Sequence, residues 1–300
     1  MISQLNASTQ QFLLNLDRIK ARADKAQQQI SSGHRISAAS DDPERLGSIL
    51  STGAELERVT QVSQNLDRVK GEVDTSEQSL ESAVKMLEQA NTIGLSGASS
   101  PKSATERSMM ADQVQGILEQ MVSLADTTQA GRYLFSGDSE QTAPYQVDLT
   151  QPNGVTAYAG SASTRRVEDA SGQTFAVGLT ADEIFDAPGD ASVFGALNQL
   201  RVALKANDAA GVQAVLPKLT AAQNQLNVEL ARSGNMQNTV NSSIDFAQKK
   251  KLSLTTALSA LADTDIVEAA MESQSAALEQ QASMSARAMI PRKSLFDYLG

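Results

Sequence analysis

Residues 261–271 read Leu261-Ala262-Asp263-Thr264-Asp265-Ile266-Val267-Glu268-Ala269-Ala270-Met271 and lie near the start of the final stretch of this chain, 258–300. Asp263 and Asp265 are both suited to cap a helix, and Glu268 supplies the return half of a capping box with Asp265. Beyond this cap, the residues that share one helix face follow one another in alternating steps of four and three, which is the heptad spacing of a coiled coil. This C-terminal heptad face consists of Val267, Met271, Gln274, Leu278, Gln281, Ser285 and Ala288.

The C-terminal heptad face is poor in apolar residues, because glutamine and serine stand where a coiled coil usually has leucine. Pro291 is expected to end the helix, and an apolar tip with Leu295, Phe296 and Leu299 closes the stretch. A helix with heptad spacing but few apolar residues requires partners, so we expect it to pack between subunits. An ordinary long intramolecular bundle is the alternative for the same pattern.

The N-terminal stretch has the same spacing and ends at Gly33, a residue type that favours the left-handed conformation after a helix. Ordering both ends costs conformational entropy, and burial of their few apolar side chains gains too little free energy to offset that cost. We therefore expect both ends to be disordered in the free monomer and to fold together on assembly. The N-terminal heptad face consists of Leu5, Thr9, Phe12, Leu16, Ile19, Ala23, Ala26 and Ile30.

The middle of the chain predicts long helices around a β-rich insert. Asp42 is suited to cap a helix of nearly fifty residues that begins at Pro43. A Gly/Ser/Pro turn over 94–101 separates it from an antiparallel third helix, for which Ser103 and Glu106 form a capping box. Short β-like pieces follow from residue 132, and helices resume at Ser192 with a break at 207–208.

We therefore expect a mainly α fold, a long-helix coiled-coil or bundle rod with a terminal helical pair and a small β-rich insert. The terminal pair combines 1–42 with 258–300. The helical rod combines 43–134 with 191–257, and the β-rich insert spans 135–190.

The composition argues against several classes of protein. Hydrophobic residues make up 41% of the 300 residues but aromatic residues only 4%, which suits slender helical bundles. The net charge of -10 argues against nucleic acid, because phosphate binding needs clustered Lys and Arg. The absence of Cys excludes disulfides, thiolate zinc sites and thiol catalysis. No signal peptide is evident and no apolar run approaches roughly 18 residues, so we expect neither a cleaved leader nor membrane insertion.

The residues that could carry chemistry have simpler structural explanations. His34, the only histidine, is expected in a loop without a catalytic role. Asp41 and Asp42 suit loop and cap hydrogen bonds better than paired acid–base chemistry. Asp263 and Asp265 suit helix capping better than metal binding. We expect no enzymatic activity, no cofactor and no metal.

Two signatures resemble the bacterial flagellin family. The first is Ile30-Ser31-Ser32-Gly33-His34-Arg35-Ile36-Ser37 followed by Ser40-Asp41-Asp42-Pro43. The second is Leu261-Ala262-Asp263-Thr264-Asp265, with Gln280-Gln281-Ala282 further along. Both lie where the family carries them, between the first two helices and near the C-terminus. We take their residues Arg35, Asp41, Asp42, Pro43, Asp263 and Asp265 as candidates for assembly, together with Phe12, Leu16, Ile19, Ile30, Val267, Met271, Leu278 and the apolar tip.

Within that family the chain is most similar to the subunits that join hook to filament. The resemblance implies a homo-oligomeric ring with flagellin on one side and another hook-associated protein on the other. It also implies export through the flagellar type III channel, an extracellular place at the hook–filament junction, and an export chaperone at the C-terminal helix. Three alternatives stay open: flagellin itself, a coiled-coil tip or translocator protein of an injection-type secretion system, and a surface enzyme with its site in the insert.

Overall fold

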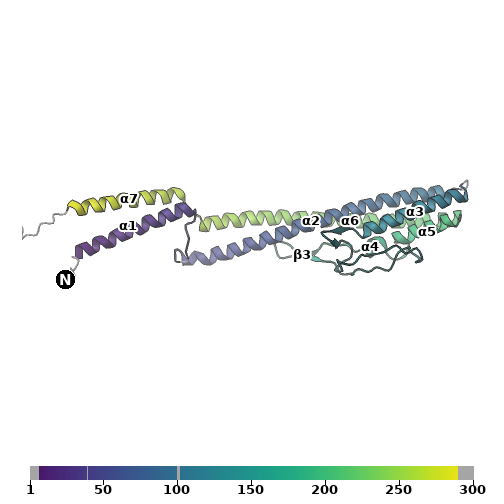
Figure 1. The fold of residues 1–300 in the computed structure, drawn as a ribbon, viewed down its shortest axis with the longest axis horizontal. Coiled ribbons are helices and arrows are strands. Elements are labelled where there is room, and N and C mark those ends of the chain that lie inside the picture. The colour runs from purple at the N-terminus through teal and green to yellow at the C-terminus, as the bar shows by residue number, and fades with distance from the viewer. Residues whose placement is uncertain (1–6, 39, 100–101, 290–300) are drawn as a thin grey trace, which may run out of the picture. The chain divides into compact units, whose positions relative to one another are not determined.

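The computed structural model describes residues 7–38, 40–99 and 102–289. These residues form a mainly helical fold with two small antiparallel sheets, as the sequence predicts (Figure 1). The chain divides into two compact units, the terminal unit (1–58 with 251–300) and the central unit (59–250). The helices are α1 (Ala7–Ser32), α2 (Pro43–Ala98), α3 (Ala104–Ala125), α4 (Ala181–Phe185), the 3-10 helix η1 (Gly189–Ala191), α5 (Val193–Lys205), α6 (Ala209–Ala262) and α7 (Ile266–Met289), and the strands are β1 (Thr128–Gln129), β2 (Arg132–Tyr133), β3 (Arg166–Glu168) and β4 (Thr174–Ala176).

The helix starts follow the predicted capping signals. Asp42 Oδ1 accepts a hydrogen bond from the Arg45 N–H at 3.2 Å, and Pro43 is the first residue of α2. Ser103 and Glu106 form both halves of the capping box of α3. These caps satisfy backbone donors that a helix leaves without an intrahelical partner.

The prediction of a turn over 94–101 is wrong for residues 94–98, because α2 continues to Ala98. Gly94 and Gly97 lie inside the helix and let other helices approach closely. A Cβ atom at Gly97 would lie 2.5 Å from Leu204 Cδ2 of α5. The glycines therefore serve helix packing rather than a turn.

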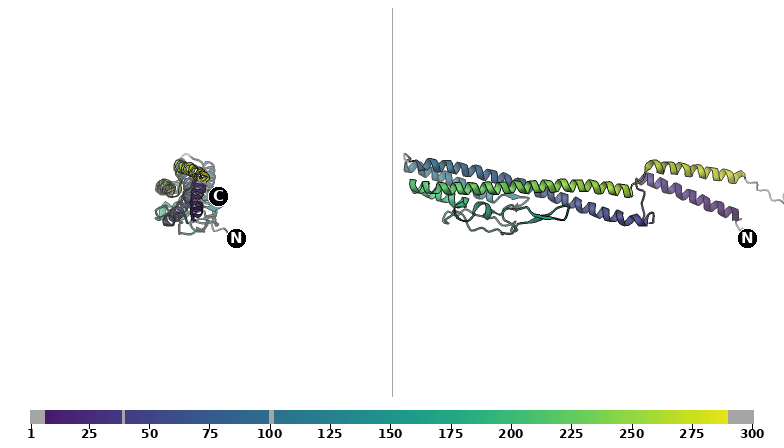
Figure 2. Two further views of the ribbon diagram at one scale, coloured as in Figure 1. Left: turned by 90° about the vertical axis from the view of Figure 1, so that its left-hand side faces the viewer. Right: turned by 180° about the vertical axis from the view of Figure 1, so that it is seen from behind.

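The core of the central unit lies where α2, α3, α5 and α6 run side by side (Figures 1 and 2). An aromatic cluster from the insert and α5 extends this core. Phe194 stacks on Phe185 with ring centroids 5.6 Å apart and meets Tyr145 edge-on at 5.0 Å. Helix residues that are fully buried in the core include Leu80, Leu87, Leu118, Met121, Leu197, Leu200, Leu219 and Leu226.

The insert contains less regular strand than the sequence indicates. The strand expected over 132–137 pairs only at Arg132–Tyr133, because Phe135 turns into the core. Its carbonyl oxygen then accepts hydrogen bonds from the Ala181 N–H and the Tyr158 hydroxyl. Side chains and loops thus provide hydrogen bonds that a longer sheet would have supplied.

Candidate assembly interface

The described part of the N-terminal heptad face, from Thr9 to Ile30, packs against α7 within the terminal unit, where α1 and α7 lie side by side (Figure 1). Leu5 lies outside the described residues. Ala26 on this face is buried, and the Arg287 guanidinium of α7 lies 5.6 Å from the Phe12 ring centroid. Arg287 Nη2 also donates to Thr9 Oγ1 at 2.6 Å. The candidate residues Phe12, Leu16, Ile19 and Ile30 are all partly buried.

The C-terminal heptad face is exposed rather than packed on α1. Val267, Met271 and Leu278 are 67%, 61% and 67% exposed. The buried apolar residues of α7 are Ala269 and Ala276, which lie on another face. Small residues in steps of seven, Ala269, Ala276 and Ser283, are the sequence signal that could have identified this pairing face.

Ion pairs add to the narrow contact between α1 and α7. Arg22 Nε lies 2.6 Å from Glu272 Oε1, and Arg22 Nη1 lies 2.9 Å from Glu279 Oε2. The hydrogen bond from Arg22 lowers the pKa of Glu272 below its ordinary value. All three side chains are more than two-fifths exposed, so these pairs orient the helices more than they stabilise them.

The two signature segments meet through their backbones. The Arg35 N–H donates to the Ala262 carbonyl at 2.8 Å, and the Thr264 N–H donates to the Gly33 carbonyl at 2.9 Å. Arg35 Nη2 donates to the Leu261 carbonyl at 2.9 Å, close to the end of α6. Gly33 has φ +72°, so the left-handed conformation expected after α1 is present. These bonds join residues near the two ends of the chain.

Asp41 organises the loop before α2. Its Oδ2 accepts hydrogen bonds from the N–H groups of Ser37 at 3.0 Å and Ala38 at 2.9 Å. The bond from Ala38, and then that from Ser37, lowers the Asp41 pKa to about 2. Lys25 Nζ lies 3.4 Å from Asp41 Oδ1 and ties this loop to α1.

Asp263 and Asp265 hold the turn between α6 and α7. Asp265 Oδ1 accepts from the N–H groups of Val267 and Glu268, which caps α7. Among the described residues Glu268 makes no return bond, so the predicted capping box is only half formed. Asp263 Oδ1 lies 3.2 Å from His34 Nδ1. Over 7–38, 40–99 and 102–289 no group of three or more acidic or histidine side chains could hold a metal ion.

The candidate residues of the apolar tip, Leu295, Phe296 and Leu299, lie outside the described residues.

The long paired helices, joined near residues 33–35 and 261–264, place the chain in the class of long-helix bundle proteins. The model of the bacterial flagellin N-terminal helical region matches residues 2–140, and that of the C-terminal helical region matches 216–299. Together they cover well over half of the sequence, so the chain belongs to the bacterial flagellin family, a family of structural proteins. None of the described helices is long and apolar enough to cross a membrane.

Two relatives within this family carry the same name, flagellar hook-associated protein 3. The chain is 26% identical over 183 residues to flagellar hook-associated protein 3 of Escherichia coli K12, covering 59% of this chain and 54% of the relative. It is 26% identical over 168 residues to the Salmonella typhimurium protein of the same name, covering 54% and 50%. The chain thus spans about half the length of these relatives.

Solved structures share the fold. A flagellar hook-associated protein of Vibrio parahaemolyticus matches with a TM-score of 0.66 and 23% identity, over 74% of this chain and 99% of that chain. Hook-associated protein 3 of Legionella pneumophila matches with a TM-score of 0.62 and 14% identity, over 71% and 98%.

Proposed function

We propose that this chain is an adaptor subunit of the bacterial flagellum that joins the hook to the filament. It forms a homo-oligomeric ring, with flagellin on one side and another hook-associated protein on the other. Membership of the flagellin family and two relatives named flagellar hook-associated protein 3 support this role. The role is structural, so it requires neither catalysis nor a cofactor, and it is performed outside the cell after flagellar export.

The exposed C-terminal heptad face is the observation that carries the proposal. Val267, Met271 and Leu278 present apolar surface along one side of α7. Covering each such side chain stabilises a complex by about 1.5–3 kcal/mol at full burial. Copies of this chain in a ring supply that cover, while α1 and α7 pair through Ala269 and Ala276.

The signature loop sets the geometry of assembly. Arg35 and Asp263 link the two signature segments, and Asp265 caps α7. Asp41 and Asp42 with Pro43 shape the entry to α2. In this proposal the terminal pair (1–42 with 258–300) is the assembling part, the rod (43–134 with 191–257) forms the wall, and the insert (135–190) projects. Before assembly the same face of α7 is open to an export chaperone.

The test replaces apolar residues of the heptad face in flagellated cells that lack the chromosomal gene. L278E and M271E are expected to be exported but to leave hooks without filaments, with flagellin released into the medium. A277E places the same charge on an exposed position beside the buried Ala276 and is the matched control. Normal filaments with both heptad-face variants would contradict the proposal, provided that A277E also supports filaments.

Flagellin itself is the second candidate function. The chain is 26% identical over 129 residues to flagellin of Clostridium tyrobutyricum, covering 43% of this chain. A flagellin polymerises by itself into long filaments, whereas a junction adaptor does not. Electron microscopy of the purified chain under polymerising salt conditions distinguishes the two functions.

A further inference from the structure

Exposed methionines of this chain gather on α7. The chain has 9 Met and no Cys, so methionine carries all of its sulfur. Among the described methionines, Met109 of α3 is 60% exposed, and Met271, Met284 and Met289 of α7 are 61%, 51% and 83% exposed. Met121 of α3 is fully buried. An oxidant in water therefore reaches the sulfur atoms of α7 directly, whereas the packed core of the central unit shields that of Met121.

Two of the exposed methionines lie on one side of α7, opposite the buried Ala269 and Ala276. Met289 lies 18 residues beyond Met271, which is five turns at about 3.6 residues per turn, so the two side chains lie along one line of the helix. Met284 lies 13 residues beyond Met271, which places it about 140° round the helix from that line. Met271 and Met289 therefore share the side of the C-terminal heptad face.

Oxidation of a methionine changes an apolar side chain into a polar one. A peroxide transfers one oxygen atom to the thioether sulfur, which loses two electrons and becomes a sulfoxide, while the peroxide O–O bond breaks and water or an alcohol is released. The C-terminal heptad face has few apolar side chains to lose, because beside Met271 only Val267 and Leu278 are large and apolar. One sulfoxide therefore removes much of the apolar surface of this face.

We propose that Met271 and Met289 are oxidation sites through which peroxides control assembly: the sulfoxide form of this face no longer packs against neighbouring copies of the chain. The inference rests on the proposed function, in which copies in a ring cover the C-terminal heptad face. A sulfoxide oxygen that is covered by an apolar surface loses its hydrogen bonds to water, which opposes burial. An assembled ring covers the same sulfur atoms, so the step acts on the subunit before assembly, and methionine sulfoxide reductases reverse it.

Mass spectrometry of the full chain after brief treatment with hydrogen peroxide tests the sites themselves. We expect sulfoxide to form at Met271 and Met289 at least about tenfold faster than at Met121, because the buried sulfur reacts only when the core opens. This measurement does not depend on assembly. Equal rates at Met271 and Met121 in a chain of unchanged circular dichroism would overturn the proposal.

Binding of the purified full chain to hooks isolated from cells that lack the gene tests the consequence. Each chain is compared with its own untreated form, after the peroxide has been removed. Treatment is expected to weaken binding of the unsubstituted chain about tenfold, the factor for burying one unpaired polar group. It should leave M271L/M289L unchanged, because leucine has no sulfur.

The matched control is M109L/M284L, which removes the two exposed methionines that lie off the Met271–Met289 line. Peroxide should weaken its binding as much as that of the unsubstituted chain. An equal effect of peroxide on both double variants would overturn the proposal. Failure of the untreated, unsubstituted chain to bind hooks would instead contradict the proposed function.

Discussion

Arg107 Nη1 lies 2.7 Å from Asn207 Oδ1, which connects the start of α3 to the link between α5 and α6. The same guanidinium donates to the carbonyl oxygens of Gly97, Ser99 and Lys102 at 2.9–3.0 Å. Arg107 is only 5% exposed, although it carries a permanent charge. Its donors satisfy carbonyl groups at and beyond the end of α2, where the helix itself offers no partner.

Replacing Arg107 by methionine is therefore expected to lower the free energy of unfolding by about 2–4 kcal/mol, because several buried carbonyls lose their donors. Urea unfolding monitored by circular dichroism measures the change. R68M, at an exposed position of α2, is the control and should change stability little. Equal stability of the two variants would show that the carbonyls at this helix end find other donors.

Two glycines in helices should respond in opposite directions to alanine. G97A places a Cβ 2.5 Å from Leu204 Cδ2 in the core, and we expect a loss of about 1–3 kcal/mol from overpacking. G116A meets no atom within 4 Å inside α3, so we expect a gain of about 0.5–1 kcal/mol from helix propensity. Thermal unfolding of both variants checks the signs, and a shift in the same direction would refute the packing role of Gly97.

The contact between α1 and α7 should be sensitive to side-chain size at one position. Ala276 is fully buried in this contact, whereas the adjacent Ala277 is exposed. A276L is expected to destabilise the pair by about 1–3 kcal/mol, because the bulky side chain pushes the helices apart. Hydrogen exchange of the α1 amides in the full chain should quicken in A276L and not in A277L. Identical exchange in the two variants would mean that α1 does not pack on this face.

The Asp41 loop should open at low pH. The folded pKa of about 2 lies below the ordinary aspartate value, so the loop is stabilised by ionised Asp41 above about pH 4. This stabilisation is lost as the pH falls through about 2, where the carboxylate becomes protonated. Amide NMR signals of Ser37 and Ala38 should shift with that midpoint, and D41N should abolish the transition while D24N, on exposed α1, retains it. A midpoint near pH 4 would show that the two N–H bonds do not hold in solution.

Short-range patterns were sufficient to predict much of the helical architecture. Capping residues located the starts of α2 and α3, because a cap acts within a few residues of its own helix, and the apolar pattern located the start of α5. The two signature segments could also be recognised from their own residues. Their contact, the hydrogen bond from the Arg35 N–H to the Ala262 carbonyl, agrees with the predicted pairing of the N-terminal and C-terminal stretches. The insert was predicted less well, because the core position of Phe135 replaced strand pairing with loop contacts.

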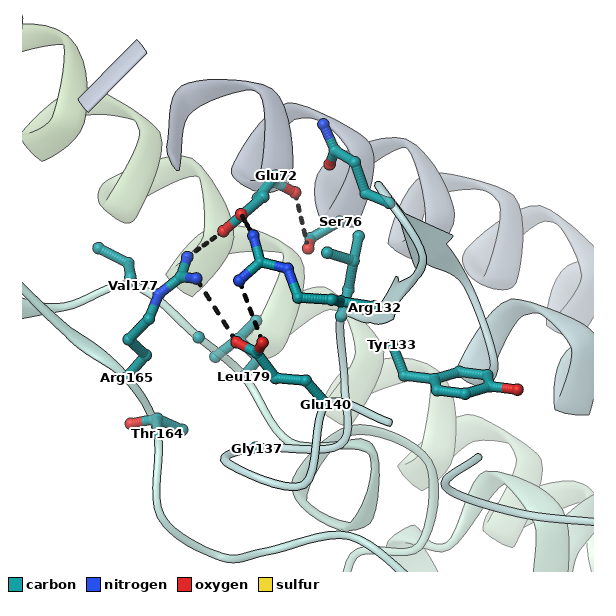
Figure 3. Close-up of a pocket in the computed structure, with 13 residues that line it drawn as sticks. Glu72, Ser76, Arg132, Tyr133, Gly137, Glu140, Thr164, Arg165, Val177 and Leu179 are labelled. Atoms are coloured by element: carbon teal, nitrogen blue, oxygen red, sulfur yellow. Dashed lines mark hydrogen bonds and ion pairs between the residues drawn. The ribbon is translucent and has the colours of Figure 1, made fainter. Parts of the chain in front are cut away.

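A mainly helical chain with heptad-spaced ends could be predicted from local patterns, because helix periodicity and caps are properties of neighbouring residues. Which face of α7 meets α1 could not be predicted locally, because it depends on contacts between the two distant ends of the sequence. Both faces of α7 have heptad spacing, but the small residues Ala269 and Ala276 of one face are buried while Val267, Met271 and Leu278 of the other are exposed, because small side chains let two helices approach closely. The ion pair between Glu72 and Arg165 (Figure 3) likewise could not be predicted from the sequence, since the long-range packing of the insert on α2 brings these residues together.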